Sequence, residues 1–242
     1  MKHITLKTKD ELQPLITHLN SYLRSVSLTK NDEEKLKGDL KEFLAKRIKR
    51  YINSKENGID LAIYSTIEKS KDMYVQVLIE TKVPNSPEMI VSGNFNKKAL
   101  HEAALYYLTE RGDENNRGIE KIIISDFNNF YIFNGEQLDL KFERNRRVNK
   151  IFEQYNNPTG DKSTGRTSWF YDELEKAIEE NPKDFVFDEV YSFNLLDFLN
   201  GEGEFSGSPE SERLNSLDSI FSAQFLLGER QESMNATVSF KF

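Results

Sequence analysis

Three charged residues near the ends of two short apolar segments could together bind a metal ion. Asp60 lies within residues 59–64, and Glu80 and Lys82 close residues 74–82. Because side chains alternate across a strand, Glu80 and Lys82 are expected on one face and Thr81 on the other. Burying either charge alone is costly, so the pair needs a shared partner, a metal ion or an open cleft.

Two carboxylates and a lysine are the groups that metal-assisted hydrolysis of a phosphodiester uses. Carboxylate oxygens are ligands that Mg²⁺, Mn²⁺ and Ca²⁺ prefer. The ion neutralises the phosphate and lowers the pKa of the attacking water, while a nearby lysine can polarise that water. We therefore predict a metal site built from Asp60, Glu80 and the backbone carbonyl of Thr81, with Lys82 as the catalytic cation. The alternative is a surface salt bridge between Glu80 and Lys82 in an unrelated α/β protein.

The elements that would position these residues form a hairpin. Residues 59–64 and 74–82 are rich in β-branched and aliphatic side chains, and the polar residues 68–72 join them. An antiparallel pairing of the two strands can bring Asp60 close to Glu80 at the same end of the sheet.

The remaining pattern predicts an α/β fold, with a mixed central sheet flanked by helices. A further strand is expected between Tyr51 and Asp60, or near Ile4. Asn31 or Asp32 can cap the second helix, whose first turn carries Glu33 and Glu34. Predicted helices cover residues 10–26, 33–51, 97–110 and 170–180, and further strands cover 119–125, 130–133 and 138–142.

Two acids open the second predicted helix. Glu33 lies near its inner face and is a candidate third acid of the site. The alternative is that Glu33 and Glu34 only provide favourable negative charge at a helix N-terminus.

The composition is compatible with a reducing cytoplasm and narrows the kinds of metal site that the chain could form. The 242 residues include no cysteine and three histidines, which argues against thiolate and His-rich metal sites. No apolar run is long enough to span a membrane, no signal-peptide core is present, and a cytoplasmic location is expected. The net charge of −7 counts against a general nucleic-acid binder, although residues 46–55 and 141–150 are basic. The alternative for each basic run is solvated helix surface.

The spacing of the acids and the lysine resembles the PD-(D/E)XK nuclease superfamily. Gly58-Ile59-Asp60-Leu61 and Ile79-Glu80-Thr81-Lys82 match its signature, with Ile59 where the superfamily name has proline. Residues 31–180 more specifically resemble the N-terminal nuclease region of type IIG restriction-modification enzymes, through segments 33–44, 99–108 and 169–174.

This resemblance implies a restriction-endonuclease-like fold and a Mg²⁺-dependent DNA endonuclease in which Mn²⁺ can substitute. It implies that Glu33, or else Glu34, joins the metal site. Glu102-x-x-x-Tyr106 stands where some members carry Gln-x-x-x-Tyr, with glutamate replacing glutamine. Double-stranded DNA is the expected substrate, and a homodimer would supply two active centres. The expected phosphate contacts are Lys46, Arg47, Arg50, Arg144, Arg146 and Arg147.

The methyltransferase half of a type IIG enzyme has no counterpart in the sequence. Residues 157–160 do not match the Asn-Pro-Pro-Tyr-type motif, and no glycine-rich cofactor turn is present. We therefore expect a fragment or a separate nuclease subunit whose methyltransferase and specificity parts lie elsewhere. A catalytically silent, nuclease-like domain that binds DNA or protein is the alternative.

The predicted organisation has four parts. Residues 1–30 form an N-terminal helical segment, 31–157 the nuclease core, 158–200 a helical extension packed on the core, and 201–242 a linker and tail, with 201–212 disordered.

Overall fold

A six-stranded mixed sheet lies at the centre of the protein. The computed structural model describes residues 6–29, 31–55, 58–112, 115–158 and 162–228. The strands follow chain order across the sheet, and only the β3–β4 pairing is parallel. They are β1 (Ile52–Asn53), β2 (Leu61–Tyr64), β3 (Val75–Thr81), β4 (Lys121–Ser125), β5 (Asn129–Asn134) and β6 (Val190–Asn194).

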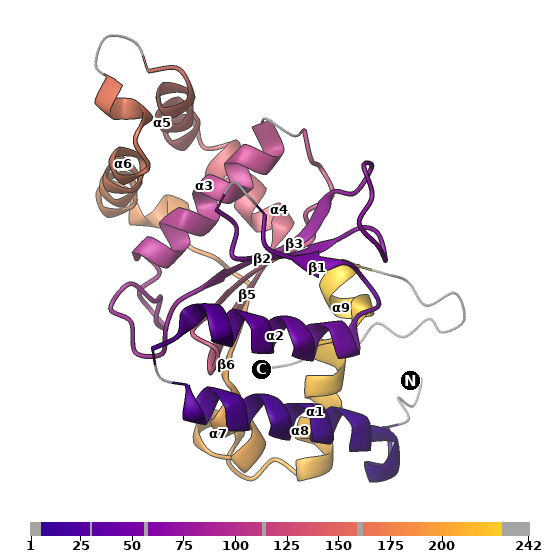
Figure 1. Ribbon diagram of the computed structural model, residues 1–242. Helices are drawn as coiled ribbons and strands as arrows, with labels where there is room; N and C mark the ends of the chain where they lie inside the picture. Colours follow the sequence, from indigo (N-terminus) through magenta and orange to yellow (C-terminus); the bar gives the residue numbers. More distant parts are fainter. Residues whose placement is uncertain (1–5, 30, 56–57, 113–114, 159–161, 229–242) are drawn as a thin grey trace, which may run out of the picture.

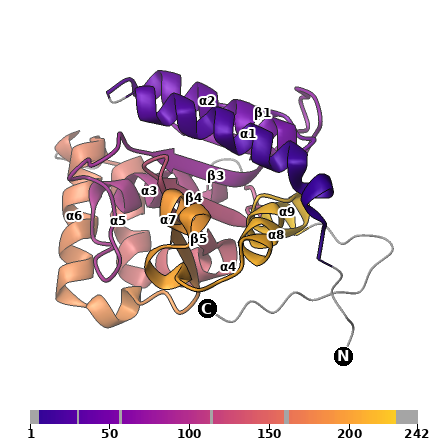
Figure 2. The same cartoon turned by 90° about the horizontal axis from the view of Figure 1, so that it is seen from below.

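Helices cover both faces of the sheet, as Figures 1 and 2 show. One face carries α1 (Lys9–Leu28), α2 (Glu33–Arg47), α7 (Leu195–Asn200), α8 (Glu210–Ile220) and α9 (Ala223–Leu227). The other carries α3 (Lys98–Gly112), α4 (Gly135–Leu138), α5 (Arg146–Asn156) and α6 (Thr167–Glu180). Each layer has its own apolar core, so the predicted α/β class with flanking helices is confirmed.

The first two helices begin where the sequence signals indicate. Thr8 and Glu11 form a reciprocal capping box at the start of α1. Of the two predicted caps of α2, Asp32 is the one used, because its carboxylate accepts a 3.0 Å hydrogen bond from the Lys35 amide. The predicted strand after Tyr51 is β1, whereas Ile4 lies outside the described residues.

The predicted strand over residues 138–142 is wrong, because these residues are helical. Asn134 stands at the N-cap position of α4 without a side-chain cap hydrogen bond, and α4 continues into a π-helical turn at Asp139–Glu143. Leu138 and Phe142 are four residues apart and both buried, which suits a helix as well as an alternating strand. Asp139 between them pairs with Arg111 of α3 at 2.7 Å, so its burial does not require a strand face.

The last third of the chain is more integrated than the four predicted parts imply. β6 lies inside the predicted helical extension yet forms the sixth strand. Residues 201–212, expected to be disordered, contain a short helical turn at Gly203–Phe205 and the start of α8. Asp218 of α8 forms ion pairs with Lys7 and with Arg47 of α2. Residues near both ends of the chain therefore belong to the same layer.

At Gly135 the backbone passes so close to the backbone of Ile119 that no side chain would fit. A Cβ built on it would lie 2.1 Å from the carbonyl oxygen of Ile119, an impossible contact with backbone. We predict that Gly135→Ala destabilises the fold by about 2 kcal/mol or more, measured by urea unfolding.

Gly38, inside α2, has nothing within 4 Å of such a Cβ. Gly38→Ala should therefore stabilise the protein by about 0.5–1 kcal/mol. Equal effects of the two substitutions would contradict this geometry.

Candidate active site at the end of the β2–β3 hairpin

The register of the hairpin carries Asp60 to the end of β3. Leu61 pairs with Ile79, so Asp60 lies level with Glu80. Oδ2 of Asp60 accepts hydrogen bonds from the backbone amide and the hydroxyl of Thr81, both at 2.8 Å. Hydrogen bonds to an ionised acceptor are stronger than neutral ones, so this pair of bonds fixes the carboxylate against β3.

Glu80, Lys82 and Glu102 form a second group of charges on the α3 side of β3. Nζ of Lys82 lies 2.6 Å from Oε1 of Glu80 and 2.5 Å from Oε2 of Glu102. All three side chains are largely shielded from solvent. Burial alone would lower the pKa of Lys82, but Glu80 and Glu102 reverse that effect and hold the pKa above its usual value. Lys82 therefore stays charged between two carboxylates.

Lys37 of α2 contacts the Asp60 side of the strand. Its Nζ lies 2.6 Å from Oδ1 of Asp60 and 3.3 Å from Oε1 of Glu33. The same Glu33 oxygen is 3.2 Å from the Thr81 hydroxyl, so Glu33 reaches the site as predicted from its helix position. Glu34 also contacts Lys37, at 2.9 Å, but its side chain is 85% exposed. Of the two acids at the start of α2, Glu33 is the better placed.

Negative charge exceeds positive charge at this end of the sheet. Glu33, Asp60, Glu80 and Glu102 provide four carboxylates against the ammonium groups of Lys37 and Lys82 and that of Lys98, which lies 3.8 Å from Glu102 and is shared with Glu88. Burial, and next the nearby Asp60 carboxylate, raise the pKa of Glu80 well above its usual range although Lys82 opposes them. Oε2 of Glu80 is buried and has no hydrogen-bond partner among the described residues. This oxygen is therefore an unsatisfied acceptor in an electronegative environment.

Two tyrosines enclose the site from the α3 side. Burial, and the charges of Glu80 and other neighbours, raise the pKa of Tyr106 on α3. Burial and the nearby Glu102 and Glu80 raise the pKa of Tyr171 on α6 in the same way. A Cβ on Gly58 would lie 2.9 Å from the Tyr106 hydroxyl, so the left-handed glycine (φ +98°) lets the backbone before Asp60 pass this ring. Both phenols remain neutral hydrogen-bond donors at physiological pH.

The side chains as placed do not form a ready metal cage. Within the described ranges, no three acidic or histidine side chains converge closely enough to hold an ion. Asp60 is turned toward Lys37 and Thr81, and Glu80 toward Lys82. The excess of carboxylates and the unsatisfied Glu80 oxygen nevertheless fit a divalent cation, because an ion would supply the missing positive charge.

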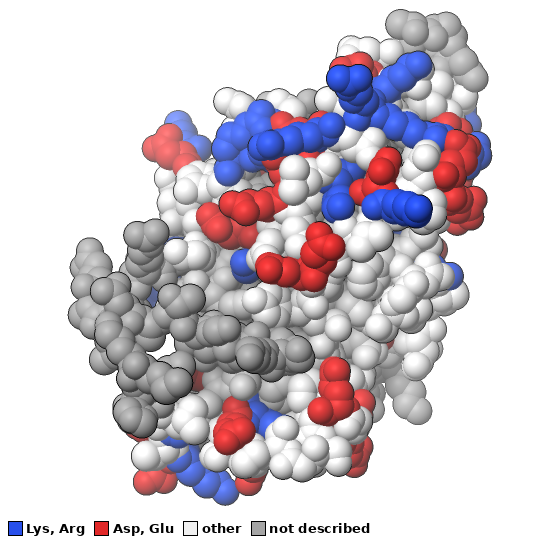
Figure 3. Space-filling view, turned by 180° about the vertical axis from the view of Figure 1, so that it is seen from behind, with Lys and Arg blue, Asp and Glu red and all other residues white. Residues whose placement is uncertain are grey.

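The predicted phosphate contacts lie apart from this cluster. Lys46 is 13 residues beyond Glu33 on α2, about 20 Å along the helix. Four of the six predicted residues form ion pairs with acidic side chains: Lys46 with Glu42, Arg47 with Asp218, Arg144 with Asp139 and Arg147 with Glu180. Arg50 donates a hydrogen bond to the carbonyl oxygen of Lys49, and Arg146 is exposed. On the face drawn in Figure 3, basic and acidic side chains are interspersed instead of forming one basic field.

Sequence reasoning missed Lys37 and Tyr171. Lys37 follows Glu33 by four residues, a spacing that puts both on one face of α2, so this signal was readable once Glu33 was singled out. Tyr171 gave no such signal, because its proximity depends on how α6 packs against α3.

The raised pKa of Glu80 predicts a pH-dependent effect of Glu80→Gln. A raised pKa means that the folded state resists ionisation, so Glu80 contributes most to stability below its unfolded pKa of about 4.5. That contribution is lost as the pH rises through the folded pKa. We therefore expect Glu80→Gln to unfold at a higher temperature than wild type at pH 8 and at nearly the same temperature at pH 4.5. A variant that is less stable than wild type at pH 8 would contradict this reasoning.

A model of a domain of unknown function (DUF7149) matches residues 3–233. No curated protein and no solved structure matches the chain. Among the helices of the described residues, none has both the length and the apolar character needed to cross a membrane.

Proposed function

The chain belongs to the DUF7149 family, and from its candidate site we propose that it is a metal-dependent DNA endonuclease that hydrolyses phosphodiester bonds. The observation that carries the proposal is that Asp60, Glu80 and Lys82 lie at one end of the β2–β3 hairpin, with Asp60 hydrogen-bonded to Thr81 and Glu80 paired with Lys82. These residues have the types and order of the PD-(D/E)XK signature. We propose by the same reasoning that the sheet is of the restriction-endonuclease-like kind.

The arrangement of helices around the hairpin supports this proposal. α2 presents Glu33 from one face of the sheet, and α3 presents Glu102 from the other. Both acids therefore approach the end of β3, where the strand carries Glu80 and Lys82. A phosphate placed there would meet carboxylates that can share a cation and an ammonium group at the same point.

Mg²⁺, or Mn²⁺ in its place, is the cofactor we propose, with Asp60, Glu80 and the Thr81 carbonyl as candidate ligands and Glu33 as a further acid. A bound ion would supply Lewis acidity and a water of lowered pKa. The chain's own groups orient the reactants. Lys82 stays protonated and can donate a hydrogen bond to the water or phosphate, and Tyr106 and Tyr171, whose pKa values are raised, remain neutral donors beside it.

A catalytically silent domain that binds DNA or protein is the second candidate. One observation favours it: both lysines of the site already neutralise carboxylates, and the acids do not converge on one point. The two candidates predict different results when the divalent ion and the nucleic acid are supplied separately.

Cleavage of plasmid DNA in Mg²⁺ or Mn²⁺ tests the proposed activity. Asp60→Asn, Glu80→Gln and Lys82→Ala should each reduce the rate by about a hundredfold or more, since each removes a group that holds the ion or stabilises developing charge. Glu42→Gln is the matched control, because this exposed acid lies on α2 and forms an ion pair with Lys46, away from the site. It should cut like wild type.

The outcomes separate the two candidates. Cleavage retained by all three site variants would rule out this site as the catalytic centre. DNA or Mn²⁺ binding by wild type without cleavage would instead favour the silent domain. Circular dichroism of each variant establishes that the fold is retained.

Lys37 provides a test of metal ligation that does not depend on cleavage. Its ammonium group forms an ion pair with Oδ1 of Asp60. The positive charge of Lys37 therefore competes with any cation that Asp60 binds. Lys37→Met should therefore tighten Mn²⁺ binding about tenfold, or ~1.4 kcal/mol, in a calorimetric titration. Lys37→Arg keeps the charge and should bind like wild type. Lys35→Met removes a lysine that contacts Asp39 of the same helix and should also leave the affinity unchanged. Unchanged affinity in Lys37→Met would exclude Asp60 as a ligand.

A further inference from the structure

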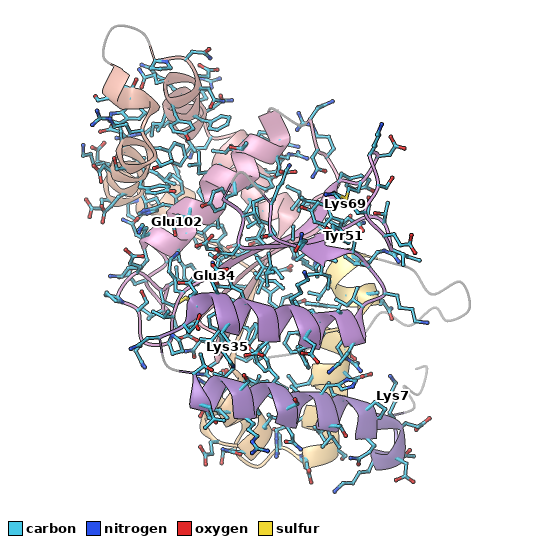
Figure 4. All side chains as sticks on the ribbon, viewed as in Figure 1. Lys7, Glu34, Lys35, Tyr51, Lys69 and Glu102 are labelled. Carbon is cyan, nitrogen blue, oxygen red and sulfur yellow. The ribbon has the colours of Figure 1, made fainter. Side chains whose placement is uncertain are left out.

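A pocket lies at the opposite end of the β2–β3 hairpin from the candidate active site. It has a volume of about 610 Å³ and is formed by β1, the hairpin and the end of α3. Figure 4 shows Tyr51 and Lys69 at this end of the sheet, and Glu34 and Glu102 at the other. On α3, Glu110 lines the pocket and Glu102 reaches the active site, eight residues or about 12 Å apart. The pocket is therefore distinct from the site already described.

Three tyrosines give the pocket flat apolar surfaces. Tyr51 and Tyr64 lie with ring centroids 5.4 Å apart, at an angle of 44°. Tyr74 is 46% exposed, a large value for an aromatic side chain beside a buried strand. Its ring passes so close to Gly118 that a Cβ there would lie 2.3 Å away. A ring held this way on one side and open on the other is suited to stack against a planar ligand.

The charges around these rings are positive on balance. Lys55 forms an ion pair with Glu110, which is almost fully buried and also accepts a 3.2 Å hydrogen bond from Asn116. Lys69 and Lys71 line the same pocket and are exposed, and in the described part of the chain neither forms an ion pair. Among the described residues that line the pocket, two positive charges remain after Lys55 is set against Glu110, in a protein whose net charge is −7.

We propose that this pocket binds a nucleotide unit, with Lys69 and Lys71 on its phosphate and the tyrosines against its base. The volume suits a ligand of that size, because small-molecule sites typically range from about 300 to 1,000 Å³. Lysines bind phosphate as point charges, and aromatic faces bind bases with little regard to sequence. A free nucleotide and one residue of a single strand share this chemistry, and the experiment distinguishes them. The proposal does not rest on the nuclease activity.

Calorimetric titration of the full chain tests the proposal with four probes: ATP, adenosine, inorganic phosphate and a 5′-phosphorylated single-stranded oligothymidylate. ATP or the oligonucleotide should bind more tightly than adenosine or phosphate, because only the first two offer both a ring and a phosphate. Lys69→Glu/Lys71→Glu should weaken that binding about tenfold or more. Tyr74→Leu should weaken it about fivefold or more, and Tyr74→Phe should retain it.

The matched control is Lys9→Glu/Lys183→Glu, which makes the same change in net charge at two exposed lysines outside the pocket. It should bind like wild type. Tighter binding of ATP identifies a free nucleotide as the ligand, and binding of the oligonucleotide alone identifies a strand. No binding of either probe, or equal loss in the control, would overturn the proposal. These results are independent of whether the Asp60, Glu80 and Lys82 variants affect DNA cleavage.

Discussion

Burial of the Glu80 carboxylate is the constraint on which the arrangement at the end of β3 depends. A carboxylate that is almost fully buried needs compensation, and Lys82 supplies only part of it because Glu102 shares the same ammonium group. Asp60 adds further negative charge from across the hairpin. The helices on both faces contribute to the balance, since Lys37 comes from α2 and Glu102 from α3. The site thus ties together the sheet and both helical layers.

The local parts of this arrangement could be predicted from the sequence. Alternation along β3 places Glu80 and Lys82 together, and the hairpin register brings Asp60 level with Glu80, although the Asp60 side chain turns toward Thr81 and Lys37. The capping position of Asp32 and the first turn of α2 likewise follow from local signals. The contribution of Glu33 was open, because an acid at a helix start is favourable there without any site. Only the packing of α2 on the sheet shows that Glu33 reaches the Thr81 hydroxyl.

Features that depend on contacts between segments far apart in the sequence could not be predicted from local sequence signals. Apolar and charged residues alternate over 138–142 as in a strand, but Leu138 and Phe142 also fit one face of a helix. In the helical conformation that the structure has, Asp139 forms an ion pair with Arg111 of α3. β6 carries Val190, Tyr191 and Phe193, residue types that favour strands, but no local signal shows that it pairs with β5. The basic residues after position 46 looked available in sequence, whereas Arg47 is held by Asp218 of α8, 171 residues away along the chain.

The way the chain ends join has a consequence for biosynthesis. Leu12 and Leu19 near the N-terminus share a core with Phe193, Leu195 and Leu217 from the last third of the chain. A nascent polypeptide that has emerged only as far as residue 157 would therefore hold a sheet without its outermost strand and an uncovered apolar layer. The ribosome must therefore deliver the segment through Leu227 before that layer can close, long after α1 and α2 have emerged.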